Sequence, residues 1–143
     1  MNELLKAIAD HLTYYGYRIA PVAPNLGPPG TLDARHDSRP IFWVIPVVRG
    51  ALFRSLYLLG EETTRDSSGF LSFLNDANTT CIVAHYYKVE QLMAVAAWYF
   101  GMHERERFDI FFQQYLTDIS NAALLWPEKS ERYFAKASAI RTE

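Results

Sequence analysis

Cys81 and His85 are the side chains whose types could supply a nucleophile and its base. Both lie in a run predicted as a strand, where four residues span about 13 Å, which is beyond hydrogen-bond reach. Alternation along that strand would place them on the same face as Val83 and Tyr87, among packing residues. We therefore interpret Cys81 as an inert, buried thiol and His85 as a packing or rim residue.

The other histidines and acids do not predict a metal site. Asp33, His36 and Asp37 share a Pro/Gly-rich loop, but three ligands with no second cluster make a poor cation site. His103 is followed four positions later by an arginine, not by the second histidine of a zinc-binding helix. The segment 27–30, Gly-Pro-Pro-Gly, cannot cradle phosphate because proline has no backbone N–H. Because no group combines acid, base and stabiliser, we expect a non-catalytic protein without metal or cofactor.

Two long helices are predicted near the ends of the chain from the spacing of apolar residues. The first covers residues 2–15, with Asn2 as its N-cap and Gly16 as a left-handed residue after its end. The second carries one continuous apolar stripe over residues 108–126 and ends at Pro127.

A short apolar helix is predicted between them, over residues 70–78. Ser67 or Ser68 can cap its start. Asn75 and Asn78 mark its C-terminal end, where asparagine tolerates a positive φ better than most residues. We expect Asn78 to be the left-handed residue that terminates the helix.

Apolar runs joined by tight turns predict the strands, at residues 17–22, 41–48, 52–59, 82–88 and 92–100. The order α-β-β-β-α-β-β-α then predicts an α+β fold, a single antiparallel sheet of about five strands with helices packed on it. Residues 1–143 are expected to form one domain. Within it we expect a Pro/Gly-rich loop at 21–40 and a short C-terminal tail helix at 128–143.

Composition limits the classes of function. The chain has 14 Lys and Arg against 16 Asp and Glu, so no basic stripe is available for nucleic acid. Its single cysteine, Cys81, cannot form an internal disulfide. The longest apolar run, at 92–100, is too short to span a bilayer as a helix, and the N-terminus does not read as a signal peptide. We expect a soluble, cytoplasmic protein without membrane insertion.

The order of elements, with Leu74-Asn75 and then Asn78 ending the central helix, resembles the YbjN family over roughly residues 2–126. Those bacterial proteins are similar in fold to type III secretion chaperones. The resemblance implies a small, non-catalytic bacterial regulator, of a sensory transduction or chaperone-like kind, that binds other protein chains. The chain departs from the family in its long Pro/Gly-rich loop.

Two predicted strands, at 41–48 and 92–100, are apolar on both faces, whereas a half-exposed antiparallel strand alternates. The two terminal helices can cover one face of the sheet. The other face is then left for the central helix or for another chain. Candidate contacts of such a protein interface are Phe70, Phe73, Leu74, Tyr86 and Tyr87. The same residues would serve equally well as intramolecular core.

The sequence therefore favours a protein-binding module, adaptor- or chaperone-like and homodimeric, that acts by burying an aromatic surface. The alternative is a small-molecule sensor or carrier, with an apolar pocket between sheet and helices lined by Trp43, Trp98 and tyrosines. A small enzyme would require His85, a carboxylate, and Cys81 or a tyrosine to meet in one cleft.

Overall fold

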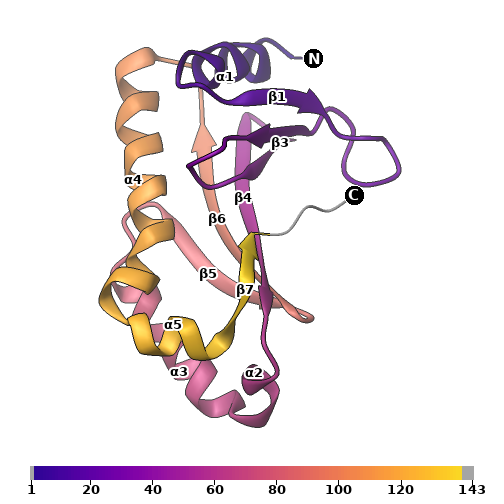
Figure 1. Cartoon of the computed structure of the whole chain (residues 1–143). Helices are drawn as coiled ribbons and strands as arrows, with labels where there is room; N and C mark the ends of the chain where they lie inside the picture. The colour runs from indigo at the N-terminus through magenta and orange to yellow at the C-terminus, as the bar shows by residue number, and fades with distance from the viewer. Residues whose placement is uncertain (1, 140–143) are drawn as a thin grey trace.

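The computed structural model describes the backbone of residues 2–139 and the side chains of residues 2–134. Five helices and seven strands follow one another along this part of the chain (Figure 1). In chain order they are α1 (Glu3–Tyr14), β1 (Arg18–Pro21), β2 (Leu32–Arg35), β3 (Phe42–Val47), β4 (Gly50–Leu59), α2 (Glu62–Arg65), α3 (Ser67–Thr79), β5 (Ala84–Val89), β6 (Leu92–Phe100), α4 (Arg105–Leu125), α5 (Pro127–Tyr133) and β7 (Phe134–Ala139).

The seven strands form one antiparallel sheet, in the order β1-β2-β3-β4-β6-β5, with β7 paired to β4. β3 pairs with β4 from Gly50 to Arg54, and β7 pairs with it farther along, at Tyr57 and Leu59. α4 runs along one side of the sheet, and the loop between β1 and β2 projects on the other (Figure 1). The predicted α+β class, with helices packed on one antiparallel sheet, is confirmed.

A strand lies inside the segment 21–40, where the sequence predicts only a loop. β2 is four residues long, too short for its alternation to stand out among prolines and glycines. Leu32 and Ala34 are buried because β2 pairs with β1 on one side and with β3 on the other. This segment is a strand because it pairs with its neighbours in the sheet, and such pairing cannot be predicted from the local sequence pattern.

The predicted tail helix at 128–143 is also corrected. Only α5 is helical, because Phe134 takes up an extended conformation and pairs with Leu59 as the first residue of β7. Residues 140–143 of that prediction lie outside the described part of the chain.

Both predicted hairpins are confirmed. The β3–β4 turn contains Arg49 and the β5–β6 turn contains Glu90, with positive φ angles of 62° and 55°. Gly50 follows the first turn, where an added Cβ atom would lie 2.5 Å from the carbonyl oxygen of Tyr99. Only glycine lets β4 approach β6 at this point.

The first helix begins and ends as predicted. The side chain of Asn2 accepts a hydrogen bond from the backbone N–H of Leu5, and Gly16 has a φ of 94°. Ile8 and Leu12 are fully buried along the apolar stripe, so α1 is held on the same side of the sheet as α4.

Aromatic rings fill the core between the sheet and α4. Phe53 of β4 packs edge-on against Phe111 of α4, with ring centroids 5.2 Å apart. Phe42 of β3 lies 5.7 Å from Phe112. Tilted and edge-to-face contacts of this kind add to the free energy gained by burying the rings. The continuous stripe that predicts α4 is therefore its sheet-facing side.

The central helix is longer than predicted and ends differently. α3 is capped by Asp66, whose carboxylate accepts from the backbone N–H of Gly69, and not by a serine. Asn75 is exposed within the helix, and Asn78 keeps a negative φ. Instead of terminating the helix, the Asn78 amide donates to the backbone carbonyl of Tyr86 and accepts from its N–H, at 3.0 and 2.6 Å. It thereby fastens α3 to the outer edge of β5.

Candidate protein-binding surface

Four of the five residues predicted as a protein interface are buried in the core: Phe70, Phe73, Leu74 and Tyr86. The Phe73 ring lies 6.2 Å from Trp126 and 5.6 Å from Tyr133. α3 therefore closes one end of the core and does not cover the second face of the sheet. The interpretation of these four residues as intramolecular core fits the structure. Only Tyr87 points to the second face.

The side of the sheet turned away from the helices carries a continuous set of side chains, all of them exposed or half-buried except the buried Ala94 and Ala96. Along β4, Ala51, Phe53, Ser55 and Tyr57 are buried, and the residues between them point the opposite way. Cross-strand pairing places side chains of β5 and β6 beside these outward residues. We define the open sheet face as Leu52, Arg54, Leu56, Leu58, His85, Tyr87, Val89, Leu92, Ala94, Ala96, Trp98 and Phe100.

Two large aromatic rings dominate one end of the open sheet face. Trp98 is 46% exposed and Phe100 is 53% exposed. Their rings stack nearly parallel, with centroids 5.8 Å apart. At the other end, Leu58 and Val89 are each 40% exposed. Such a run of exposed apolar side chains is typical of a surface that another molecule covers.

The loop between β1 and β2 covers the outward side chains of β3. Trp43 and Ile45 point the same way as the open sheet face, yet both are buried. Gly27 of the loop lies against the Trp43 ring, where an added Cβ atom would come within 3.0 Å of it. The Pro/Gly-rich loop thus shields one flank of the sheet and leaves the outward side chains of β4 and β6 open.

Arg54 lies at the centre of the open sheet face. Trp43 and Ala96 are its neighbours on the adjacent strands, and Leu52 and Leu56 are on either side of it along β4. Its Nε atom is buried and has no hydrogen-bond partner in the described part of the chain. A buried N–H without an acceptor costs free energy. The face is therefore apolar with one unsatisfied donor at its centre.

Cys81 and His85 do not meet. Cys81 lies before β5, with its Sγ 3.5 Å from the carbonyl oxygen of Ala77 in α3. His85 is exposed on the open sheet face, with its ring 5.2 Å from that of Tyr87. Burial, and to a smaller extent the nearby Asp118, raises the pKa of the Cys81 thiol to about 12. At neutral pH the thiol is protonated and is a poor nucleophile.

We therefore expect Cys81 in the folded protein to react slowly with iodoacetamide. Only the thiolate attacks, so the raised pKa predicts a rate at pH 8 at least about tenfold below that of the unfolded chain. Mass spectrometry of alkylated samples taken over time, with and without urea, measures both rates. Equal rates would contradict a partly buried thiol with a raised pKa.

Asp118 is a buried residue that the sequence reasoning missed. Its carboxylate accepts hydrogen bonds from the backbone N–H groups of Ile82, Val83 and Ala84, at 2.8 to 3.0 Å. The side chain is fully buried, and it orders the segment that leads into β5. The available signal was an acid on the apolar stripe of α4, three residues after Tyr115.

A histidine pair links α1 to the start of α4. His11 Nδ1 lies 3.2 Å from His103 Nε2, and His11 Nε2 lies 2.9 Å from a carboxylate oxygen of Asp109. Burial, then the neighbouring His11 and Arg107, lower the pKa of His103. Both imidazoles also contact the Phe108 ring. The cluster fastens two helices together, and no three acids, histidines or cysteines among the described residues are placed to hold a metal ion.

The loop residues considered as cation ligands are used separately. Asp33 pairs with Arg35 on β2, and Asp37 pairs with Arg18 at 3.1 Å. His36 accepts a hydrogen bond from the backbone N–H of Ser38. These side chains do not converge on one point.

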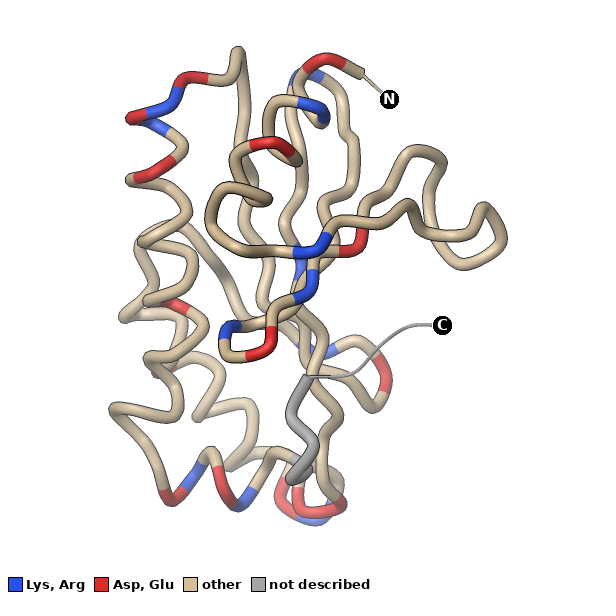
Figure 2. The backbone as a smooth tube through the Cα atoms, turned by 45° about the horizontal axis from the view of Figure 1, so that its top comes forward, with Lys and Arg blue, Asp and Glu red and all other residues tan. Residues whose placement is uncertain are grey.

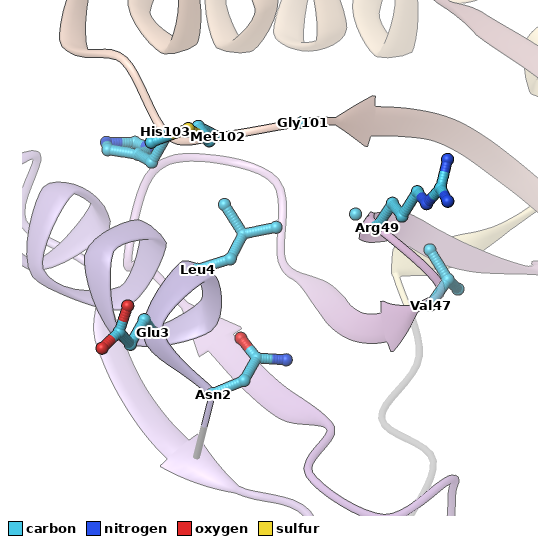
Figure 3. A pocket seen from close by; sticks show the side chains of 9 residues that line it. Asn2, Glu3, Leu4, Val47, Arg49, Gly101, Met102 and His103 are labelled. Atoms are coloured by element: carbon cyan, nitrogen blue, oxygen red, sulfur yellow. The ribbon is translucent and has the colours of Figure 1, made fainter.

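A cavity of about 620 Å³ lies where the start of α1, the β3–β4 turn and the β6–α4 connection meet. Its lining includes Leu4, Arg49 and His103 (Figure 3). In that view Leu4 extends into the space between the elements, while the guanidinium of Arg49 points away from Glu3. A smaller cavity of about 180 Å³ lies between Tyr57 and Tyr86 in the core. The small-molecule alternative requires a pocket lined by Trp43, Trp98 and tyrosines. Neither of these two cavities is lined by Trp43 or Trp98.

Charged residues of both signs are interspersed along the chain (Figure 2). The net charge of −2 and this mixture leave no basic face to neutralise phosphates. Among the helices of the described residues, none combines the length and the hydropathy needed to cross a membrane.

No protein-family model matches the sequence. No curated protein matches it either. The structure is similar to that of YbjN from E. coli, which is described as a candidate transcription regulator. The TM-score is 0.68, the match covers 92% of this chain and 95% of that chain, and 12% of the aligned residues are identical.

The chain has the fold of YbjN. The resemblance inferred from the order of elements is thereby confirmed for the fold. At this low sequence identity, the similarity is one of fold alone.

Proposed function

We propose that this protein is a non-catalytic binding protein, an adaptor- or chaperone-like regulator of the bacterial cytoplasm that captures another protein chain on its open sheet face. The exposed Trp98 and Phe100 carry the proposal, because large aromatic side chains of this kind supply most of the binding free energy at protein interfaces. The YbjN fold supports a regulatory or adaptor role.

The surroundings of the open sheet face support the same function. Cys81 and His85, the candidates for catalysis, lie apart, and the Cys81 thiol is protonated at neutral pH. The mixed charges favour a protein partner over a nucleic acid. The homodimer stays a prediction, and light scattering across a dilution series would measure it.

A double variant, Trp98→Ser with Phe100→Ser, tests the proposal. The probe is a fluorescently labelled amphipathic helical peptide of about 18 residues, and fluorescence anisotropy measures its Kd. We expect the variant to bind at least about tenfold more weakly than the unchanged protein, because two aromatic contacts are lost. Both substitutions are at exposed positions, so thermal unfolding should shift little.

The matched control is Ile110→Ser with Leu124→Ser on the solvent side of α4, where the two residues are 61% and 73% exposed. This control removes as much exposed apolar surface from a different face. It should leave the Kd within about twofold, as expected for residues outside an interface. Equal weakening by both double variants, or by neither, would count against the open sheet face as the binding surface.

A further inference from the structure

We propose that the open sheet face binds an amphipathic helix of another protein, and that this helix carries a carboxylate within its apolar stripe that pairs with Arg54. The inference rests on the proposed function and adds to it the chemistry of the partner. Arg54 is the observation that carries it, since its buried Nε has no acceptor in the described structure.

A partner that covers the open sheet face must also satisfy Arg54. The residue is flanked by Leu52 and Leu56 along β4 and by Ala96 across the sheet. An apolar partner would strip water from the rest of the guanidinium and leave a charge buried without compensation. A carboxylate accepts two parallel N–H bonds from a guanidinium, which offsets that cost and fixes the position of the partner.

A second copy of the chain does not meet this requirement. The outward positions of the open sheet face are apolar apart from Arg54 and His85, and none is Asp or Glu. Two copies stacked face to face would bury two Arg54 side chains opposite apolar groups or each other. The partner is therefore a different protein.

The partner binds through side chains and does not add a strand. β6 is paired on both edges, and β4 pairs with β6 along one edge and with β3 and then β7 along the other, so the centre of the face offers no strand edge for a partner to extend. The outer edge of β5 is blocked at Tyr86, because the Asn78 amide occupies both its N–H and its carbonyl. A helix laid across the sheet packs on its face through side chains alone, without joining it.

The small residues of β6 fit this geometry. Ala94 and Ala96 lie along the middle of the face and are 0% and 1% exposed, between the larger side chains of β4 and β5. Trp98 and Phe100 stand at one end. The alanines are already covered, so the apolar residues of a helix would contact the more exposed side chains around them, Trp98 and Phe100 above all.

Three labelled helical peptides test the inference. They have about 18 residues and are identical except for one position at the centre of the apolar stripe, which is Glu, Gln or Lys. Anisotropy titrations use the unchanged protein and the variant Arg54→Met, which keeps an unbranched stem but removes the guanidinium and its charge. We expect the Glu peptide to bind the unchanged protein at least about tenfold more tightly than the Gln peptide, and the Lys peptide to bind least. Arg54→Met should abolish this order.

The outcomes separate the inference from the proposed function. If all three peptides bind equally and the Trp98→Ser/Phe100→Ser variant weakens them all, the inference is overturned and the proposed function stands. If no peptide binds, both fail. If light scattering shows a dimer that Trp98→Ser/Phe100→Ser dissociates, the occupant is a second copy and the inference is overturned.

A measurement without peptide completes the test. Because the buried Arg54 Nε has no acceptor among the described residues, Arg54→Met should leave the thermal midpoint unchanged or raise it. A fall of more than a few degrees would mean that Arg54 already makes a stabilising interaction within the chain, and the requirement for a carboxylate from the partner would not hold.

Discussion

Replacing Asp118 by alanine is expected to lower the free energy of unfolding by about 3–5 kcal/mol. The carboxylate is fully buried and accepts from three successive backbone N–H groups, those of Ile82, Val83 and Ala84. Alanine would leave these donors without partners at the start of β5, and an unpaired buried donor costs more than the net value of its bond. Urea unfolding followed by tryptophan fluorescence measures the change.

Asp118→Asn separates charge from shape in the same experiment. The amide keeps one acceptor oxygen but turns an NH2 group toward N–H donors, so we expect a loss between those of the alanine variant and the unchanged protein. Asp76→Ala on α3 is the matched control. No side-chain hydrogen bond is described for Asp76, and a loss within about 0.5 kcal/mol is expected there. A loss below about 1 kcal/mol for Asp118→Ala would show that the three amides find other partners.

Phe73→Ala is expected to cost a similar amount, about 3–5 kcal/mol. The side chain is fully buried and its ring contacts Trp126, Tyr133 and Phe134. Truncation removes these contacts and leaves a cavity that the surrounding rings cannot fill. The midpoint and slope of urea unfolding, measured for the purified variant, give the loss.

Leu71→Ala on the same helix is the control, because Leu71 is 54% exposed. It should change the free energy of unfolding by less than about 0.5 kcal/mol. The pair also distinguishes the two interpretations of the central helix. A Phe73→Ala variant that keeps its free energy of unfolding but loses affinity for a partner would show that Phe73 belongs to an interface. The expected loss of stability would identify Phe73 as a core residue.

Sequence alone could predict most of the sheet. The β3–β4 and β5–β6 hairpins were evident because each joins two apolar runs by a tight turn, and the long stripe of α4 has a clear helical period. β2 and β7 were not evident, because β2 has only four residues and because both are made strands by pairing with other strands of the sheet. The period of a sequence records local geometry, and these two elements depend on partners elsewhere in the chain.

The candidate surface was predictable in kind but not in position. Strands that are apolar on both faces did predict a second apolar face, and Trp98 and Phe100 are exposed there. Of the residues proposed for it, Tyr87 lies on the open sheet face. The other four are buried, because α3 packs against α5 and the edge of β5 and not over the sheet. Alternation within β5 then decides that Tyr86 points inward and Tyr87 outward. The position of Arg54 among apolar neighbours could not be predicted from the sequence, because it depends on the pairing register of β4 with β3 and β6.

The hydroxyl group of Tyr115 fixes the position of α4 along the sheet. It lies 3.0 Å from the carbonyl oxygen of Val95 and 3.0 Å from Ser55 Oγ, and the other buried aromatic residues of α4 are Phe108, Phe111 and Phe112. Phe108, Phe111 and Phe112 have identical side chains, and the last two lie about one helical turn after the first. If α4 were displaced along its axis by one turn, phenylalanine rings would still contact the sheet at nearly the same positions. Only one longitudinal position brings the hydroxyl of Tyr115, the one tyrosine of α4, to the Val95 carbonyl that accepts its hydrogen bond and to the Ser55 hydroxyl. The hydrogen bonds of Tyr115 thus matter more for specifying one position of α4 on the sheet than for the free energy of unfolding. Without them, the aromatic stripe could pack on the sheet in more than one position.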